Sequence, residues 1–141
     1  MKYIFLTKEF YNDYKACSEI EKKQDRPYIQ VCIEIDGIIY AIPLRSHIRH
    51  EHAFWTDKEN RCGLDFSKTV LLLKPDEYID TERSPYIRPN EFKNLKGKEY
   101  EIKQKLIRYI KKYKKAKLKI QFKENQVLCK YSTLQYFENY I

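Results

Sequence analysis

At 141 residues the chain is long enough to bury the core of one domain but not of two, and 13 tyrosines against 3 glycines argue against disorder. No window approaches the roughly 18 to 20 apolar residues that span a membrane, so no membrane partner is expected. The opening residues MKYIFLTKEF turn polar too early for a signal peptide. The sequence therefore predicts a cytoplasmic protein whose four widely spaced cysteines stay reduced.

The net charge of +8 is concentrated in one segment. Between Lys93 and Lys119 there are 12 Lys and Arg residues and 2 Glu, a local net charge of +10, so the rest of the chain carries −2. Such a segment is the expected electrostatic footprint of a polyanion, although a solvated lysine-rich helix face would have the same composition.

The first third of the chain predicts strands around one short helix. Residues 2–6 form a short apolar run typical of a strand, and Thr7 can cap the aromatic-faced helix that follows. Residues 28–44, YIQVCIEIDGIIYAIPL, hold two β-branched runs on either side of Asp36-Gly37. Because this dipeptide favours a two-residue turn, we expect a β-hairpin here.

The central part of the chain predicts one buried strand and one long helix. Residues 68–73 are too continuously apolar to face water, so they indicate a central strand. Residues 74–90 contain three prolines and are irregular. Over residues 98–116 the apolar residues then recur at spacings of three and four, which predicts an amphipathic helix. This helix could begin as early as Asn90, but Gly97 disfavours that start.

The C-terminal segment predicts two strands and a short helix. Residues 117–122 and 127–131 could pair around Glu124-Asn125, and the Ser-x-x-Gln pattern at Ser132 is a capping signal for a terminal helix. We therefore predict an α+β fold: a compact single domain over residues 1–141, with a twisted antiparallel sheet flanked by helices.

The most unusual stretch is Tyr40–Trp55, YAIPLRSHIRHEHAFW, which holds every histidine of the chain. One interpretation is a metal site, completed by Cys62 or Asp57, but the H-x-x-H-x-H spacing matches no familiar zinc pattern, and helical geometry would turn His52 away from the other two. A second is a polar loop with structural histidines. Solvation alone does not account for three histidines interleaved with Arg45, Ser46 and Arg49, because lysine and glutamate would serve solubility better.

A third interpretation is RNA phosphodiester chemistry. Cleavage by the 2′-hydroxyl needs a base, an acid and cations that stabilise charge on phosphorus. Histidine suits both proton transfers because its ordinary pKa lies near neutrality. Arginine offers planar donors to phosphate oxygens, and such preorganised charge is usually the largest catalytic contribution. No metal is required, and the basic segment would bind the rest of the strand.

The same region resembles a known family. RPYIQVCIEIDGIIYAIPL, then RSHIRHEHAF, then GLDFSK resemble the toxins of type III toxin–antitoxin systems, the ToxN/AbiQ group, and are most similar to the TenpN/CptN branch. The resemblance covers residues 26–68 and is weaker beyond them. It implies a MazF/Kid-like and ToxN-like antiparallel-sheet fold.

The resemblance also implies a function. Such proteins are metal-independent endoribonucleases without a cofactor, and they leave 2′,3′-cyclic phosphate and 5′-hydroxyl ends. They are inhibited by a repeated pseudoknot antitoxin RNA, which they also process and with which they form closed assemblies. Several act in abortive infection against phage.

Site residues follow from this resemblance position by position. It places Arg26, Ser46 and Lys68 in the catalytic set. ToxN-like proteins have Thr-Ser and nearby lysines where this chain has Arg45-Ser46-His47, so histidine is expected to take over a proton-transfer role here. The first candidate is His50 and the second is His47, whereas no role is assigned to His52. The residues expected to contact RNA are Arg45, Arg49, Lys98, Lys103, Arg108, Lys111 and Lys112.

Two other classes of function stay open at the level of sequence. A non-catalytic RNA- or DNA-binding regulator could use the same basic surface, but it would not need the cluster of serine and histidine. A metal-dependent nuclease would lose its activity in EDTA. Trp55 and its neighbour Phe54 could stack on bases, although packing in the core is an equally good account of both.

Overall fold

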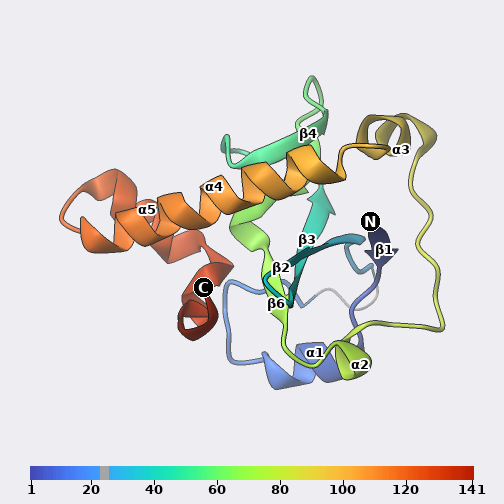
Figure 1. Cartoon of the computed structure of the whole chain (residues 1–141), viewed down its shortest axis with the longest axis horizontal. Helices are drawn as coiled ribbons and strands as arrows, with labels where there is room; N and C mark the ends of the chain where they lie inside the picture. Colours follow the sequence, from blue (N-terminus) through green and yellow to red (C-terminus); the bar gives the residue numbers. More distant parts are fainter. Residues whose placement is uncertain (23–25) are drawn as a thin grey trace.

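The fold is α+β, as the sequence predicts. The computed structural model describes residues 1–22 and 26–141, and within them six strands form one antiparallel sheet with helices around it (Figure 1). The strands are β1 (Lys2–Ile4), β2 (Gln30–Ile35), β3 (Ile38–Arg45), β4 (Ala53–Asp57), β5 (Cys62–Asp65) and β6 (Val70–Leu72). Their order is β1-β2-β3-β5-β4, and β6 also pairs with β3.

The predicted β2–β3 hairpin is confirmed, and β3 is the strand on which the sheet is built. Asp36 and Gly37 both have positive φ angles, 50° and 81°, as a tight hairpin turn of the primed type requires. One edge of β3 pairs with β2 along its length. The other edge is shared, because residues 39–41 pair with β6 and residues 44–45 pair with β5. Arg45 therefore ends β3 directly beside β5.

The N-terminal predictions are also confirmed. After β1, Thr7 caps helix α1 (Lys8–Asp13) by accepting a hydrogen bond from the backbone N–H of Phe10. Phe10 is fully buried and packs edge-on against Tyr78 of the short helix α2 (Pro75–Tyr78). Helix α1 and the long helix α4 (Glu99–Leu118) lie on opposite sides of the β2–β3 hairpin (Figure 1).

The strand predicted at 68–73 is shorter and differently placed. The Asp65 side chain accepts a hydrogen bond from the Ser67 N–H and starts a 3₁₀ turn, η1 (Phe66–Lys68), so the strand begins only at Val70. Residues 70–72 are buried as predicted, but β6 has β3 as its strand partner and is not central. The residues of β6 are therefore buried by side chains packed above and below the sheet. Such burial does not require a neighbouring strand on each edge of β6.

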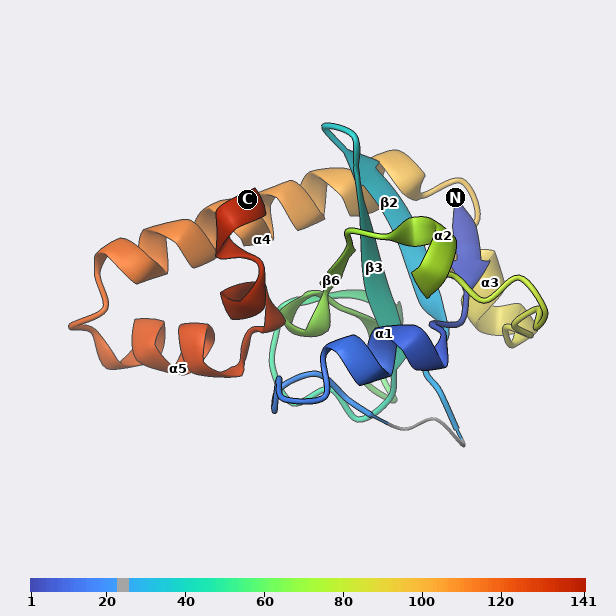
Figure 2. The same ribbon diagram turned by 90° about the horizontal axis from the view of Figure 1, so that it is seen from below.

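The predicted amphipathic helix is confirmed as α4. Its buried residues recur at helical spacing and include Ile102, Leu106 and Tyr113. Helix α3 (Pro89–Leu95) is separate, because Gly97 adopts a left-handed φ of 75° between the two helices. The C-terminal half of α4 projects beyond the sheet, and α5 (Lys123–Tyr131) folds back beside it (Figure 2).

The strand pair predicted at 117–122 and 127–131 is wrong. Helix α4 continues to Leu118, and the second run is α5, whose Leu128 and Cys129 are buried. Leu118 and Phe122 stay exposed at 83% and 49%, and they lie at the end of α4 that projects beyond the sheet (Figure 2). Ser132 does cap the next element, but that element is the 3₁₀ helix η2 (Thr133–Tyr136), followed by η3 (Glu138–Tyr140).

Candidate functional site

A buried carboxylate organises the histidine loop. Asp65 ends β5 and is fully buried. One carboxylate oxygen accepts a 2.6 Å hydrogen bond from Arg45. The other lies 3.0 Å from Nε2 of His50 and 2.6 Å from Oγ of Ser67. Three chain segments that are distant in sequence, the end of β3, the loop before β4 and turn η1, therefore meet at one side chain.

The hydrogen-bond and ion-pair partners of Asp65 stabilise the ionised form of its carboxylate. Burial alone would raise the pKa of this carboxyl group, but the hydrogen bonds from His50 and Ser67 and the charge of Arg45 outweigh it, so its pKa lies below the ordinary value. Burial opposes the charge of Arg45 in the same way, yet Asp65 holds the pKa of that guanidinium above its usual range. The pair is therefore ionised at neutral pH.

His50 is held at both ring nitrogens. Its Nδ1 accepts a 2.9 Å hydrogen bond from the backbone N–H of His52. An Nδ1 that accepts leaves the proton of the neutral ring on Nε2, which therefore donates to Asp65. This arrangement fixes the backbone of the loop and presents the neighbouring His52.

Arg61 fixes the same loop from the other side. Its Nε donates to the carbonyl of Ile48 at 2.5 Å and its Nη2 to the carbonyl of His50 at 2.8 Å. The guanidinium also lies over the ring of Trp55, 4.7 Å from its centroid. The loop between β3 and β4 is thus anchored by Asp65 at one point and by Arg61 at another, which preorganises the side chains that it carries.

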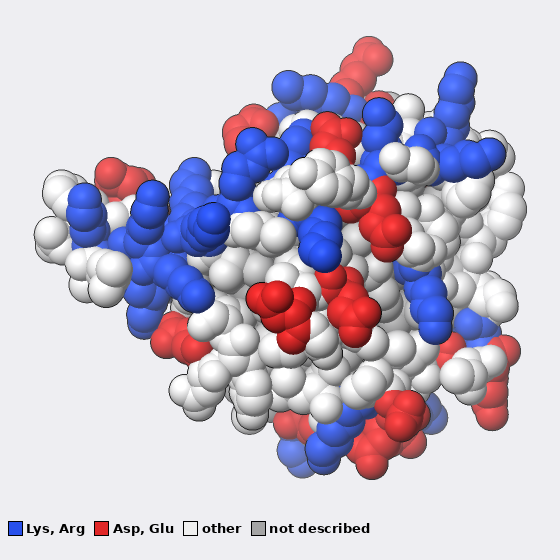
Figure 3. All heavy atoms as spheres, viewed as in Figure 1, with Lys and Arg blue, Asp and Glu red and all other residues white. Residues whose placement is uncertain are grey.

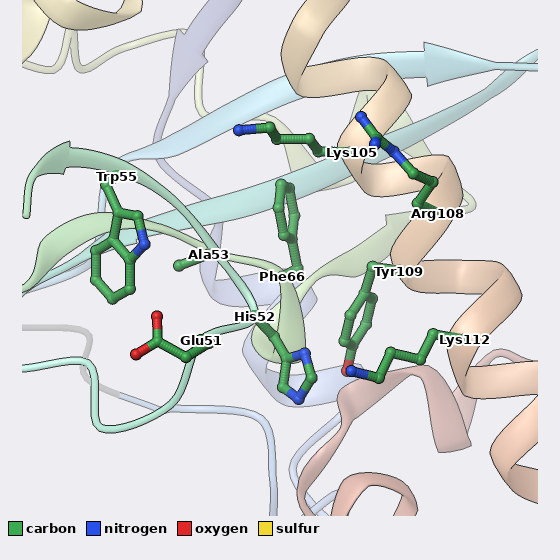
Figure 4. Close-up of a pocket in the computed structure, with 9 residues that line it drawn as sticks. All are labelled: Glu51, His52, Ala53, Trp55, Phe66, Lys105, Arg108, Tyr109 and Lys112. Carbon is green, nitrogen blue, oxygen red and sulfur yellow. The ribbon is translucent and has the colours of Figure 1, made fainter.

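His52 faces a basic cavity of about 400 Å³ (Figure 4). Its ring lies 5.4 Å from that of His50 and 5.5 Å from that of Tyr109, centroid to centroid. Within the described residues, its ring nitrogens make no hydrogen bond. The other residues that line the cavity are Glu51, Ala53, Trp55 and Phe66 on the sheet side, and Lys105, Arg108, Tyr109 and Lys112 on α4.

The surroundings of His52 favour the neutral imidazole. Burial, followed by the charge of Lys112, lowers the pKa of His52 below 6.5, and this outweighs the opposite effect of Asp65 and Glu51. A neutral imidazole at pH 7 can accept a proton from a bound hydroxyl group, which is the requirement for a general base.

Replacement of Lys112 by glutamine should raise the pKa of His52, because it removes a positive charge that opposes protonation of the ring. An NMR titration of the imidazole protons measures this directly, and the exposed His47 provides an internal reference. Lys93→Gln, on α3 and outside this cavity, is the control with the same change of charge. A His52 pKa that is unchanged by Lys112→Gln would show that the lysine does not act on this ring.

The structure separates the catalytic residues expected from sequence. Ser46, His47 and Arg49 are exposed and line a second hollow of about 670 Å³, together with Arg61 and Arg88. His50 meets Ser67 and not Ser46. Lys68 donates to Glu19 at 3.2 Å and to the carbonyl of Tyr131 at 2.8 Å. Arg26 is exposed in the segment before β2. The expected set is therefore not one cluster.

The expected RNA-binding residues also fall into groups. Arg45 is bound to Asp65, whereas Lys98 lies at the start of α4, 3.9 Å from Glu101. Lys103 is half-buried further along the same helix. Arg108, Lys111 and Lys112 line a groove of about 600 Å³ with Lys115 and Lys119.

The α4 groove leads to the His52 cavity, because Arg108 and Lys112 line both. Lys and Arg side chains gather along this projecting part of the molecule in the space-filling view (Figure 3). A polyanion lying in the groove would therefore reach the histidine.

Several residues of the site were missed in the sequence. Asp65 and Ser67 occur in the GLDFSK segment, where an Asp-x-Ser pattern after a buried run was the available signal for a capped turn. His52 follows His50 by two residues, and a bend of the backbone at His50 and Glu51 brings the two rings within 5.4 Å of each other. Tyr109 has the spacing of a core residue of α4, and its hydroxyl donates to Ser132 at 2.9 Å.

In the residues that the structure describes, no three His, Cys, Asp or Glu side chains are grouped so that they could hold a metal ion. Within the same residues, no helix has both the length and the apolar character needed to cross a bilayer. Comparisons of the chain with family models, with curated proteins and with solved structures found no match.

Proposed function

We propose that the protein is a metal-independent endoribonuclease that cleaves RNA by attack of the 2′-hydroxyl on the adjacent phosphate. One observation carries this proposal: the ring of His52, whose pKa is lowered, faces a cavity whose opposite wall is lined by Lys105, Arg108 and Lys112. A base beside several cations is what the reaction needs.

The proposed reaction uses residues of this cavity. His52 takes the proton of the 2′-hydroxyl as the 2′-oxygen bonds to phosphorus. The bond from phosphorus to the 5′-oxygen breaks, and Lys112, which lies beside Tyr109 and faces His52 (Figure 4), gives that oxygen a proton. Lys105 and Arg108 neutralise charge on the phosphate. The products are a 2′,3′-cyclic phosphate and a 5′-hydroxyl. His50 acts as a positioning residue, since both its nitrogens are engaged.

We further propose that this endoribonuclease is the toxin of a type III system in the cytoplasm. The resemblance over residues 26–68 supports that context, and the groove lined by Lys111, Lys115 and Lys119 is a suitable surface for the antitoxin RNA. Short tandem repeats and a terminator directly upstream of the coding sequence would support it. Expression of that repeat RNA should then relieve growth inhibition by the protein.

Purified protein is expected to cleave a short single-stranded RNA in the presence of EDTA. Analysis of the ends by mass spectrometry should find 2′,3′-cyclic phosphate and 5′-hydroxyl groups, and an otherwise identical 2′-deoxy strand should stay intact because it lacks the nucleophile. Tight binding of intact RNA would instead favour a non-catalytic regulator. Activity that depends on added divalent ions would favour a metal-dependent nuclease.

A further inference from the structure

We propose that the His52 cavity binds one unstacked guanine base, and that Glu51 reads it. This rests on the proposed function, because the base would be that of the nucleotide whose 2′-hydroxyl attacks. The predicted product therefore ends in guanosine 2′,3′-cyclic phosphate.

The two walls of the cavity have different chemistry. The α4 wall carries Lys105, Arg108 and Lys112, which suit phosphate oxygens. The opposite wall carries Trp55 and the Glu51 carboxylate (Figure 4). A cavity that bound phosphates alone would gain nothing from a carboxylate, because like charges repel. The carboxylate already has one donor in Arg61, 3.3 Å away, and its exposure of 71% leaves it accessible to a second partner with hydrogen-bond donors.

The sheet side of the cavity offers room and a stacking surface for a base. Ala53 and Trp55 alternate along β4 and line the same cavity, and the small side chain of Ala53 leaves space between Trp55 and His52 (Figure 4). The guanidinium of Arg61 lies 4.7 Å from the centre of the Trp55 ring and holds that ring in place. Aromatic side chains bind unstacked bases by stacking on them, and stacking has little preference among the four bases. Selectivity must therefore come from a polar group.

The Glu51 carboxylate selects guanine by the pattern of donors. Among the four bases, guanine alone presents two adjacent donors, N1–H and the 2-amino group, on its Watson–Crick edge. Adenine and cytosine place a ring acceptor beside their amino group, and uracil places carbonyl oxygens on both sides of its N–H. Arg61 donates a 3.3 Å hydrogen bond to one oxygen of this carboxylate. A bidentate contact of this type discriminates between bases by about 10-fold or more.

The test uses Trp55, the only tryptophan of the chain, as a fluorescent probe. Full-length protein is titrated with the 3′-monophosphates of guanosine, adenosine, cytidine, uridine and inosine. We expect the guanosine nucleotide to quench Trp55 at a concentration about 10-fold or more below the other three standard nucleotides. Inosine, which lacks the 2-amino group, should bind more weakly than guanosine.

Glu51→Gln should remove the preference for guanine, because an amide offers one acceptor and one donor to an edge with two donors. Glu9→Gln, an exposed glutamate on α1, is the matched control and should keep the wild-type preference. Equal quenching by all four standard nucleotides, no quenching at all, or a guanine preference that survives in Glu51→Gln would overturn the proposal.

The result is independent of cleavage. Selective guanosine binding by a protein that leaves RNA intact would support the base site and refute the endoribonuclease. Cleavage after every nucleotide, with no binding preference, would support the endoribonuclease and refute the guanine site.

Discussion

Replacement of His52 by alanine should lower the rate of RNA cleavage by about 100-fold or more, because a positioned general base contributes about 10² to 10⁴ in rate. The loss should lie in kcat, since the phosphate is held by the cations of α4 and not by this ring. In the wild type the rate should fall as the pH drops below 6.5 and protonates His52, whose pKa is lowered. Single-turnover cleavage in EDTA across this pH range measures both effects.

Two further variants make this result interpretable. His50→Ala should also reduce cleavage, but it removes a hydrogen-bond partner of buried Asp65, so its loss of activity should come with a lower free energy of unfolding. His52 makes no such bond in the described part of the chain, so His52→Ala should lose activity without a comparable loss of stability. A large loss in His47→Ala and none in His52→Ala would instead place the reaction in the hollow beside Ser46.

The parts of the fold that were predictable depend on local chemistry. The β2–β3 hairpin follows from Asp36-Gly37, which reaches positive φ angles at small cost, and α4 follows from the long helical spacing of its apolar residues. Residues 127–131 were misassigned because a run of five gives too short a pattern to separate a strand from a helix face. These residues form a helix because their apolar side chains pack against α4.

The site was less predictable, because tertiary pairing assembles it. The sequence singled out the histidine loop, but not its anchor, since Asp65 reaches the loop only through the pairing of β5 with β3 and β4. That pairing brings Ser67 to His50 in place of Ser46. The choice between His50 and His52 rests on which ring nitrogens are occupied, and residue spacing carries no information about this.

Asp65→Asn should lower the free energy of unfolding by about 3 kcal/mol at pH 7, because removal of one member of a buried ion pair leaves the other without compensation. The amide keeps the volume of the side chain, so the loss reflects charge and hydrogen bonding. The Arg45 side chain as a whole is 22% exposed, and one of its guanidinium nitrogens lies 3.8 Å from Glu21, which limits the cost. Urea unfolding followed by Trp55 fluorescence measures it, and Asp76→Asn, an exposed control in the first turn of α2, should cost less than about 1 kcal/mol.

The difference between wild type and Asp65→Asn should depend on pH with a defined sign. The pKa of Asp65 is lower in the folded protein than in the unfolded chain, where it is about 3.9. Its ionisation therefore contributes stability fully above that unfolded value, and the contribution is lost as the pH falls through the folded pKa. The two unfolding curves should be well separated at pH 7 and converge below about pH 4. A gap that widens in acid would mean that Asp65 is protonated in the folded protein, and the loop carrying His52 would then be held by a neutral hydrogen bond instead of an ion pair.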